Sequence, residues 1–285
     1  MTSYRLTLIT PLFSKGSYDD RPEVRPSSIR GQLHWWFRAL GELPADENAV
    51  FGSVHSNPVL ASKVVIRVGN VQGATGQIGT LPHKHGGHAS RKWAFTPGTS
   101  FELYWLERLG GLRQHHRKAF ERTIEGWLLA GTLGLRATRA AGSFVWEALT
   151  PGGARMPDTL QAYTARCAEV LKNAPLRFAL LQEAFDSAEE ARRVVSDTLG
   201  GREDSKGSND LERLRNPLGR VFGGRKTSPL RFRIVQVAGA FHIAALWDDR
   251  RKVTGNLQGD LKAIIDLLAS RDKPIGRLLQ ESSLA

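Results

Sequence analysis

The sequence is poor in cysteine and has no long apolar run, and each absence excludes a class of protein. The single cysteine, Cys167, excludes an intramolecular disulfide and a cysteine-rich zinc site. No apolar segment approaches the roughly 20 residues of a membrane-spanning helix. The first residues alternate like a strand and do not resemble a signal peptide. We therefore expect a soluble, cytoplasmic protein with no membrane partner.

Acidic residues are missing from two long segments. No Asp or Glu lies between Glu47 and Glu102 or between Glu212 and Asp248, and the whole chain carries a net charge of +12. Positive charge is thus concentrated in segments that alternate with mixed ones, the pattern of a protein with a basic face. Such a face favours a polyanionic partner, and nucleic acid fits better than a membrane surface.

The usual signatures of catalysis are also missing. The sequence contains no phosphate-binding P-loop, nucleophile elbow or polymerase-like metal cluster. His34, His115 and His116 are candidates for general acid–base chemistry, but none has a partner at a spacing that the sequence can establish. The acidic pair at residues 19–20 is more typical of a turn, and the histidines of residues 83–88 lack the companions of a zinc site. We expect a protein that is not an enzyme and has no metal or cofactor.

Hydrophobic periodicity predicts an α+β protein. Alternation with period two indicates strands, and apolar residues at helical spacing indicate helices. In the first half the expected order is strand, helix, strand, strand, helix and strand, at residues 4–10, 28–40, 63–68, 99–105, 112–130 and 143–149. This βαββαβ order is that of the ferredoxin-like fold, shared by RRM-type RNA-binding domains. We therefore predict a ferredoxin-like RNA-binding domain over residues 1–150.

A Pro- and Gly-rich segment at residues 151–157 predicts a domain boundary, followed by a second domain over residues 151–285. The second domain is expected to contain helices at residues 158–172, 184–199 and 257–268, and strands at residues 176–181, 230–237 and 241–247. The tetrapeptide VFGG at residues 221–224 repeats VFGS at residues 50–53, and each precedes a strand. We predict two ferredoxin-like halves packed together, of which the second is degenerate.

The segment RPSSIRGQLHWWFRAL, at residues 25–40, is the strongest candidate for a binding element. Pro26 sets an extended approach, and Ser27 or Ser28 is expected to cap a helix. Two faces follow at helical spacing, the apolar Ile29, Leu33, Trp36 and Leu40 and the basic Arg30, His34 and Arg38. Free N–H groups at the start of the helix, beside Arg25, suit a phosphate. A helix whose arginines are merely solvated is the alternative.

Three further basic segments are candidate contacts. Residues 131–143 hold Arg136 and Arg139 among small residues, which allow a polyanion to approach the backbone. A plain connecting loop is the alternative. Residues 69–98 are expected to form a long loop whose Lys84, Arg91 and Lys92 touch RNA or a neighbouring subunit, unless the loop is merely solvated.

Aromatic residues at the exit of this loop and cations before a late strand complete the set. Trp93 and Phe95 could stack on bases, but their position beside a strand favours core packing. Arg225 and Lys226 precede a strand with Arg231 and Arg233 on its polar face. RNA contact and an exposed edge strand protected by charge are equally good interpretations of that segment.

Residues 25–40, followed by VFGS at residues 50–53, resemble the signature of the first-subunit family of the type III-B CRISPR (Cmr) effector, in the RAMP superfamily of RNA-binding proteins. The resemblance implies a non-catalytic subunit of an antiviral complex. Its partners would be the CRISPR guide RNA, single-stranded target RNA and other RAMP subunits of the Cmr complex. The resemblance also implies a β-hairpin within residues 69–98.

Under the same resemblance, residues 131–143 correspond to the glycine-rich loop of RAMP proteins. Gly142 and Ser143 fit that pattern, which makes Ser143 a further expected RNA contact, whereas Ala140 and Ala141 depart from it. Two alternatives stay open. One is an endoribonuclease of the same superfamily that processes CRISPR RNA, and the other is an assembly adaptor whose basic face binds acidic protein.

Overall fold

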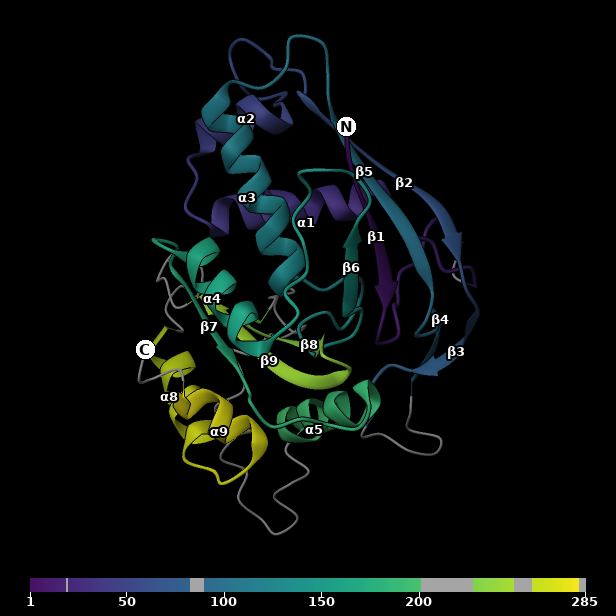
Figure 1. Cartoon of the computed structure of the whole chain (residues 1–285), viewed down its shortest axis with the longest axis vertical. Coiled ribbons are helices and arrows are strands. Elements are labelled where there is room, and N and C mark those ends of the chain that lie inside the picture. The colour runs from purple at the N-terminus through teal and green to yellow at the C-terminus, as the bar shows by residue number, and fades with distance from the viewer. Residues whose placement is uncertain (19, 83–89, 201–227, 249–257, 282–285) are drawn as a thin grey trace.

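The computed structural model describes residues 1–18, 20–82, 90–200, 228–248 and 258–281 (Figure 1). Its helices and antiparallel sheets confirm the predicted α+β class. No helix in these ranges is long and apolar enough to cross a membrane. The elements are β1 (Thr2–Leu8), α1 (Pro26–Ala39), α2 (Pro44–Phe51), β2 (Val64–Gln72), β3 (Thr75–Gly79), β4 (Arg91–Phe95), β5 (Ser100–Glu107), α3 (Gln114–Ala130), β6 (Phe144–Ala148), α4 (Leu160–Leu171), β7 (Leu176–Leu180), α5 (Ala188–Gly200), β8 (Leu230–Val237), β9 (Ala240–Asp248), α8 (Gln258–Ala269) and α9 (Pro274–Glu281).

The first half contains a 4-stranded antiparallel sheet in the order β2-β5-β1-β6. Together with α1 after β1 and α3 after β5, this is the split βαβ arrangement, so the predicted βαββαβ order is confirmed here. Figure 1 shows α1 and α3 on the same face of the sheet. Alternate side chains such as Arg5 point to the opposite face, which is open to solvent.

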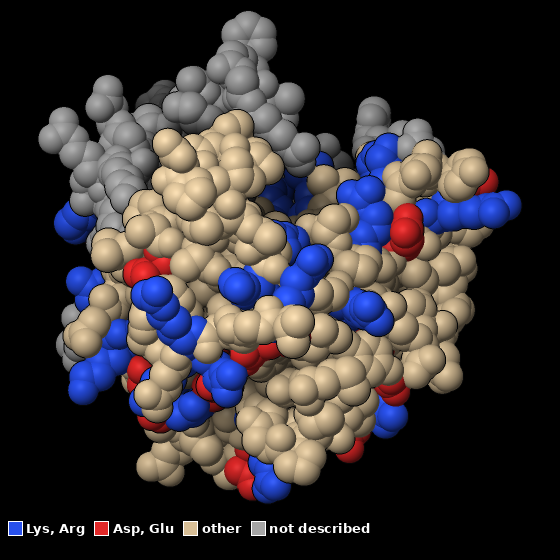
Figure 2. All heavy atoms as spheres, turned by 90° about the horizontal axis from the view of Figure 1, so that it is seen from above, with Lys and Arg blue, Asp and Glu red and all other residues tan. Residues whose placement is uncertain are grey.

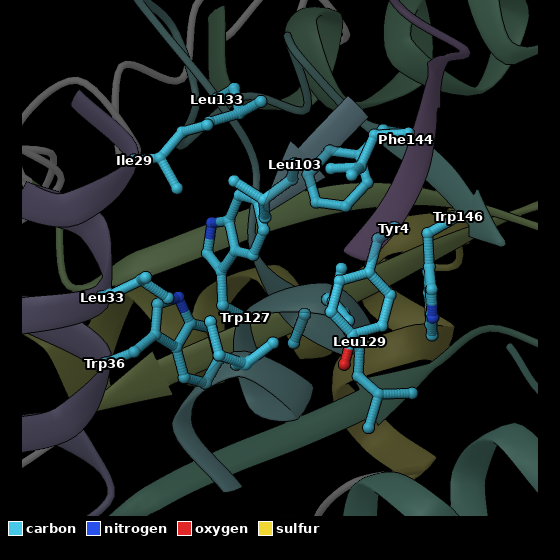
Figure 3. Packing of buried hydrophobic residues seen from close by; sticks show 14 of the residues in the cluster. Tyr4, Ile29, Leu33, Trp36, Leu103, Trp127, Leu129, Leu133, Phe144 and Trp146 are labelled. Carbon is cyan, nitrogen blue, oxygen red and sulfur yellow. The ribbon is translucent and has the colours of Figure 1, made fainter. Parts of the chain in front are cut away.

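The core of the first half lies between this sheet and its helices. The predicted apolar stripe of α1 is buried, as Ile29, Leu33, Trp36 and Leu40 show. Figure 3 shows Leu33 and Trp36 beside Trp127 of α3. A Cβ at Gly126 would lie 3.3 Å from the Trp36 ring, so the glycine permits the close approach of α1 and α3.

Three elements of the first half were not predicted from periodicity. β3 and β4 pair as an antiparallel ribbon inside the segment expected to be a loop, which agrees with the hairpin that the resemblance implied. Gly76 and Gly79 weaken the strand signal of β3, because glycine has no side chain to pack. The short helix α2 begins at Pro44 and carries Asp46 and Glu47 in its first turn, where carboxylates stabilise a helix.

The second half contains a 3-stranded antiparallel sheet in the order β7-β9-β8. This is the order of β1, β5 and β2 in the first sheet, and α5 follows β7 as α1 follows β1. The described residues after β9 form α8 and α9 and no fourth strand, and α9 was not predicted. The repeated tetrapeptide at residues 221–224 lies outside the described residues. The boundary at residue 150 stays a prediction.

The two halves share one buried cluster. It includes Tyr163 and Cys167 of α4 and Val235 of β8, together with Trp127 of α3. A parallel bridge between Arg139 and Phe232 adds a segment of the first half to the edge of β8. The exposed edge strand considered for β8 is therefore wrong, because a segment of the first half covers that edge.

Arg233 lies inside the contact between the halves. Its side chain was expected on a polar face, but the residue is 3% exposed, so that prediction is wrong. The guanidinium donates to the carbonyl oxygens of Leu128 at 2.6 Å, Gly131 at 2.7 Å and Phe144 at 2.5 Å. The first two lie at the C-terminal end of α3, where the helix dipole favours a cation. Burial lowers the pKa of Arg233.

Candidate nucleic-acid interface

The start of α1 differs from the predicted cap. The helix begins at Pro26 and its N-cap is Arg25, with no capping hydrogen bond from a side chain. The prediction that Ser27 or Ser28 caps the helix is wrong. Pro is favoured at the first helical position, so the helix begins at Pro26, before both serines. Ser27 is exposed, and Arg25 Nη2 lies 3.5 Å from Ser28 Oγ. No acidic residue occupies the first turn, so the terminus still suits an anion.

The basic ridge of α1 faces α2, not open solvent. Glu47 of α2 is buried, and its Oε1 accepts from His34 Nδ1 at 2.6 Å. Arg38 Nη1 lies 3.4 Å from the same oxygen, although 57% of the Arg38 side chain is exposed. The Glu47 carboxylate therefore contacts both His34 and Arg38 of the ridge. Arg38 keeps an exposed guanidinium that can also reach a phosphate.

Arg30 of α1 has a structural role. Its guanidinium donates to Ser62 Oγ at 3.0 Å and to the carbonyl oxygen of Phe51, the last residue of α2. It also lies over the Phe51 ring, 5.7 Å from the centroid. Burial lowers the pKa of Arg30. The side chain thus uses its donors to hold the end of α2 against α1, which leaves it poorly placed for a phosphate.

The glycine-rich segment at residues 131–143, here called the arginine loop, folds back on itself. Leu133 N donates to Gly142 O, and Gly142 N donates to Pro11 O. Four of its residues have positive φ, namely Gly134, Arg136, Ala140 and Gly142. Ala140 has φ +60°, a left-handed conformation that glycine adopts more easily. The departure from the family pattern at this position therefore keeps the backbone shape that a glycine would give.

The arginine loop presents its predicted contacts unequally. Arg136 is exposed and Arg139 is half-buried. Ser143 is fully buried, and its hydroxyl donates to Ala140 O at 3.0 Å and accepts from Ile234 N at 3.0 Å. The prediction that Ser143 contacts RNA is therefore wrong, because its hydroxyl links the loop to β8. In the sequence Ser143 is only a polar residue before an apolar strand, and this does not reveal whether its side chain faces inward.

The structure brings α1, the arginine loop and β8 together. Ala140 N donates to Phe232 O at 3.1 Å, which joins the loop to β8. Arg231 of β8 stacks over the Trp35 ring of α1 at 3.8 Å from its centroid. Burial lowers the pKa of Arg231 to about 10. Like Arg233, Arg231 therefore acts at a contact between the halves.

Arg192 of α5 belongs to the same region and was not predicted. It is buried, donates from Nη2 to Thr80 O at 2.9 Å, and lies 5.7 Å from the centroid of the Phe13 ring. Burial lowers the pKa of Arg192 to about 10, and the neighbouring positive charge of Arg136 contributes. An arginine on the buried stripe of α5, beside Ala188, Ala191 and Val195, is the signal that could have revealed it.

The ribbon of β3 and β4 carries exposed basic and aromatic side chains. Arg91 and Lys92 are exposed, and Arg91 Nη2 donates to Gln77 O at 2.6 Å. Trp93 is 38% exposed, so its predicted core packing is wrong, whereas Phe95 is buried as predicted. The predicted contacts Lys84, Arg225 and Lys226 lie outside the described residues. Figure 2 shows Lys and Arg side chains gathered across the middle of one face, with few Asp and Glu side chains among them.

The histidines have partners that the sequence did not reveal. His116 Nε2 lies 3.0 Å from Asp46 Oδ1, and the ring of His115 lies 3.9 Å from that of His116. One possible ligand atom from each of these three residues lies within 4.8 Å of the others. The N-terminal ends of α2 and α3 disfavour a cation. We interpret the cluster as a contact between the two helices. The histidines at residues 83–88 are not described.

Fold and surface together define a class of protein. The chain combines a split βαβ first half, a glycine-rich loop that carries arginines, and a basic face. Residues 5–145 match the family model of the RAMP superfamily. The matched segment includes α1, the ribbon and the arginine loop.

The sequence is also similar to that of an individual protein. The chain is 34% identical over 73 residues to CRISPR system Cmr subunit Cmr1-2 of Pyrococcus furiosus. That alignment covers 22% of this chain and 37% of the relative, so it spans well under two thirds of the relative's length. The resemblance to the first-subunit family of Cmr complexes is thereby confirmed.

Solved structures show the same fold over most of the chain. The crystal structure of Cmr1 from Pyrococcus furiosus in its apo form has a TM-score of 0.58 at 15% identity, covering 92% of this chain and 96% of that one. A chain in the cryo-EM structure of a type III-B Cmr-β complex, bound to cognate target RNA and AMPPnP, has a TM-score of 0.60 at 11% identity. It covers 92% of this chain and 99% of that chain. Such identities show a shared fold.

Proposed function

We propose that this chain is a non-catalytic RNA-binding subunit of a type III-B CRISPR (Cmr) effector complex. The observation that carries the proposal is the arginine loop, which holds an exposed Arg136 on a left-handed backbone where α1, α5 and β8 meet. Backbone N–H groups in such loops, together with guanidinium groups, form sites for phosphate. The RAMP match, which includes this loop, and the likeness to a Cmr subunit support the same function.

The contact surface would follow the exposed cations around this loop. The first turn of α1, Arg38 in its last turn, and the ribbon extend it, through Arg25, Ser27, Ser28, Arg38, Arg91, Lys92, Arg136 and Arg139. Phosphate contacts position a nucleic acid without reading its sequence, so guide RNA, target RNA or both would bind there. The structurally similar Cmr-β chain comes from a complex bound to target RNA. Other RAMP subunits would pack against this chain in the cytoplasm.

The salt dependence of RNA binding tests this proposal. Each phosphate contact on single-stranded RNA contributes about 0.7 to the slope of log affinity against log salt. Arg136→Ala/Arg139→Ala should therefore weaken binding and reduce the slope by about 1.4. The measurement is fluorescence anisotropy of a labelled single-stranded RNA over a series of salt concentrations.

A matched control removes two cations elsewhere. Lys262 of α8 and Lys273 before α9 are exposed, and Figure 1 shows α8 and α9 away from α1 and from the ribbon of β3 and β4. Lys262→Ala/Lys273→Ala should leave the slope unchanged. An equal change in both double variants would mean that only net charge matters. Absence of RNA binding by the wild type would favour the assembly adaptor.

An endoribonuclease is the second candidate, and the pair of His34 and Glu47 is the observation that favours it. A buried carboxylate that orients an imidazole is an arrangement used in general acid–base catalysis. The His34 side chain is 27% exposed, and its ring stacks on Phe51 at 4.1 Å. Metal-independent cleavage of CRISPR repeat RNA that His34→Ala abolishes would replace the binding function with this one.

A further inference from the structure

A pocket of about 320 Å³ opens on the face of the first sheet that α1 and α3 leave uncovered. It is lined by Arg5, Asn70, Gln72, Ser100, Phe101 and Glu102. These residues come from the neighbouring strands β1, β5 and β2, and Arg5 lies directly opposite Glu102. The pocket is at the lower end of the size range of ligand sites, roughly 300–1,000 Å³. None of its lining residues belongs to α1 or to the arginine loop.

A bulge in β2 directs one side chain into the pocket. The register of β2 shifts between Gly69 and Gln72, and Asn70 within the shift has φ +51°. Positive φ is uncommon outside glycine, although Asn tolerates it better than most residues. Asn70 Nδ2 donates to Glu102 Oε2 at 2.7 Å. Bulges of this kind commonly re-aim a side chain next to a binding site.

The carboxylate of Glu102 is held in a fixed position. Its Oε2 accepts from Asn70 and from the hydroxyl of Tyr104, while Arg5 Nη2 donates to Oε1 at a longer 3.4 Å. The Glu102 side chain is 16% exposed, against 67% for Glu147, which is the other carboxylate bound by Arg5. The close hydrogen bonds therefore fall on Oε2, and Oε1 can accept a further donor from a ligand.

The charges of the pocket select a neutral ligand with donors and acceptors on one edge. A phosphate would meet the Glu102 carboxylate and a cation would meet the Arg5 guanidinium, so each would encounter a like charge. Guanine is neutral and offers two adjacent donors, N1–H and the N2 amino group, either of which can donate to Oε1 of Glu102, the oxygen that Asn70 and Tyr104 leave open. Its O6 and N7 accept from groups such as the Arg5 guanidinium and the Asn70 or Gln72 amide.

We propose that this pocket binds one unpaired guanine of single-stranded RNA, an inference that rests on the RNA-binding function proposed above. Four-stranded sheets of RRM domains bind unstacked bases on their open faces in a comparable way. The base would enter between β1, β5 and β2, with Glu102 on its N1 and N2 edge and Arg5 toward O6. This contact adds a base preference at one position to phosphate binding elsewhere.

Base-substituted RNA tests the proposal. An oligouridine with one central guanine should bind the wild type about tenfold more tightly than the all-uridine strand. Replacing that guanine with hypoxanthine, which lacks the N2 amino group, should remove part of the preference. Glu102→Gln should abolish the preference. Glu147→Gln should preserve it, because Glu147 also pairs with Arg5 at 3.4 Å but does not line the pocket.

Equal affinity of the wild type for the guanine and all-uridine strands would overturn the proposal, as would equal loss of preference in Glu102→Gln and Glu147→Gln. Free guanosine, which has no phosphate, separates this proposal from the proposed function. Guanosine binding that Glu102→Gln abolishes supports the pocket even if RNA affinity does not depend on salt. Salt-dependent RNA binding without guanosine binding overturns the pocket and leaves the phosphate-contact function standing.

Discussion

At the scale of single residues, backbone conformation decides how the arginine loop presents its cations. Arg136 has φ +63° and Ala140 has φ +60°, and each such conformation costs a residue with a side chain roughly 1–2 kcal/mol. It persists where the surroundings fix it. Thr10 Oγ1 donates to Ala140 O at 2.8 Å, and Ser143 Oγ donates to the same oxygen. The proposed RNA binding therefore depends on the residues that hold the loop as well as on its arginines.

Gly142→Ala should destabilise the protein by about 2–4 kcal/mol, because strain and steric overlap act together. Gly142 has φ +66°, and an added Cβ would lie 2.0 Å from Leu133 O. Gly152 provides the control, since it has φ +81° but nothing lies within 4 Å of an added Cβ. Gly152→Ala should cost about 1 kcal/mol. Urea unfolding measures the stability of both variants. Equal losses of unfolding free energy would show that the structure adjusts to relieve the contact with Leu133.

At the scale of elements, buried arginines define how β8 joins the first half. Arg231 stacks on Trp35 of α1, and Arg233 donates to three carbonyl oxygens of the first half. Each cation is therefore compensated by carbonyl dipoles or an aromatic face, which costs less than an unpaired buried charge. The strand whose two arginines were expected on a polar face instead uses them to hold the two halves together.

Arg233→Leu should lower the free energy of unfolding by about 3–5 kcal/mol. The substitution leaves three buried carbonyl oxygens without their donor, and each unsatisfied group costs about 1–3 kcal/mol, partly recovered by the apolar replacement. Arg177 of β7 is an exposed arginine on a strand, so Arg177→Leu should change stability by less than about 0.5 kcal/mol. Chemical denaturation measures both variants. A small effect of Arg233→Leu would mean that water replaces the guanidinium.

At the scale of the whole molecule, one buried cluster spans the two halves. Cys167 of α4 packs in the same cluster as Trp127 of α3 and Leu6 of β1. Side chains of the first half therefore cannot be exposed without disturbing α4 and β8. We expect the described parts of both halves to unfold in one cooperative transition.

Cys167 reports on this transition, because the chain has no other cysteine. Burial raises the pKa of its thiol to about 12 from an ordinary value of 9.0. The reactive thiolate is therefore suppressed in the folded state at pH 8 and released on unfolding. Ellman's reagent should react slowly with native protein, and reaction should rise at the same denaturant concentration as the loss of tryptophan fluorescence. Rapid reaction with native protein would mean that α4 opens independently.

Local patterns predicted much of the fold. The stripe of Ile29, Leu33 and Trp36 identified α1, and alternation identified the strands of both sheets, because these patterns reflect the side that each element buries. α2 and the β3–β4 ribbon were not predicted from periodicity, since a short helix and a glycine-containing strand show little of it. The candidate site was predicted less well. Arg30, Ser143 and Arg233 have the residue types of an RNA contact, but their partners lie inside the protein.

By itself, the sequence determined the α+β class, the βαββαβ order of the first half, the basic character and the RAMP resemblance. The first three depend on composition or on spacing between near neighbours, and the resemblance depends on the motif at residues 25–40. The tertiary structure decided which cations remain exposed. Arg136 and Arg38 reach the surface, whereas Arg233 and Arg192 are buried. The physical reason is that a guanidinium can donate to phosphate oxygens or to carbonyl oxygens, and only the folded chain determines which of these it meets.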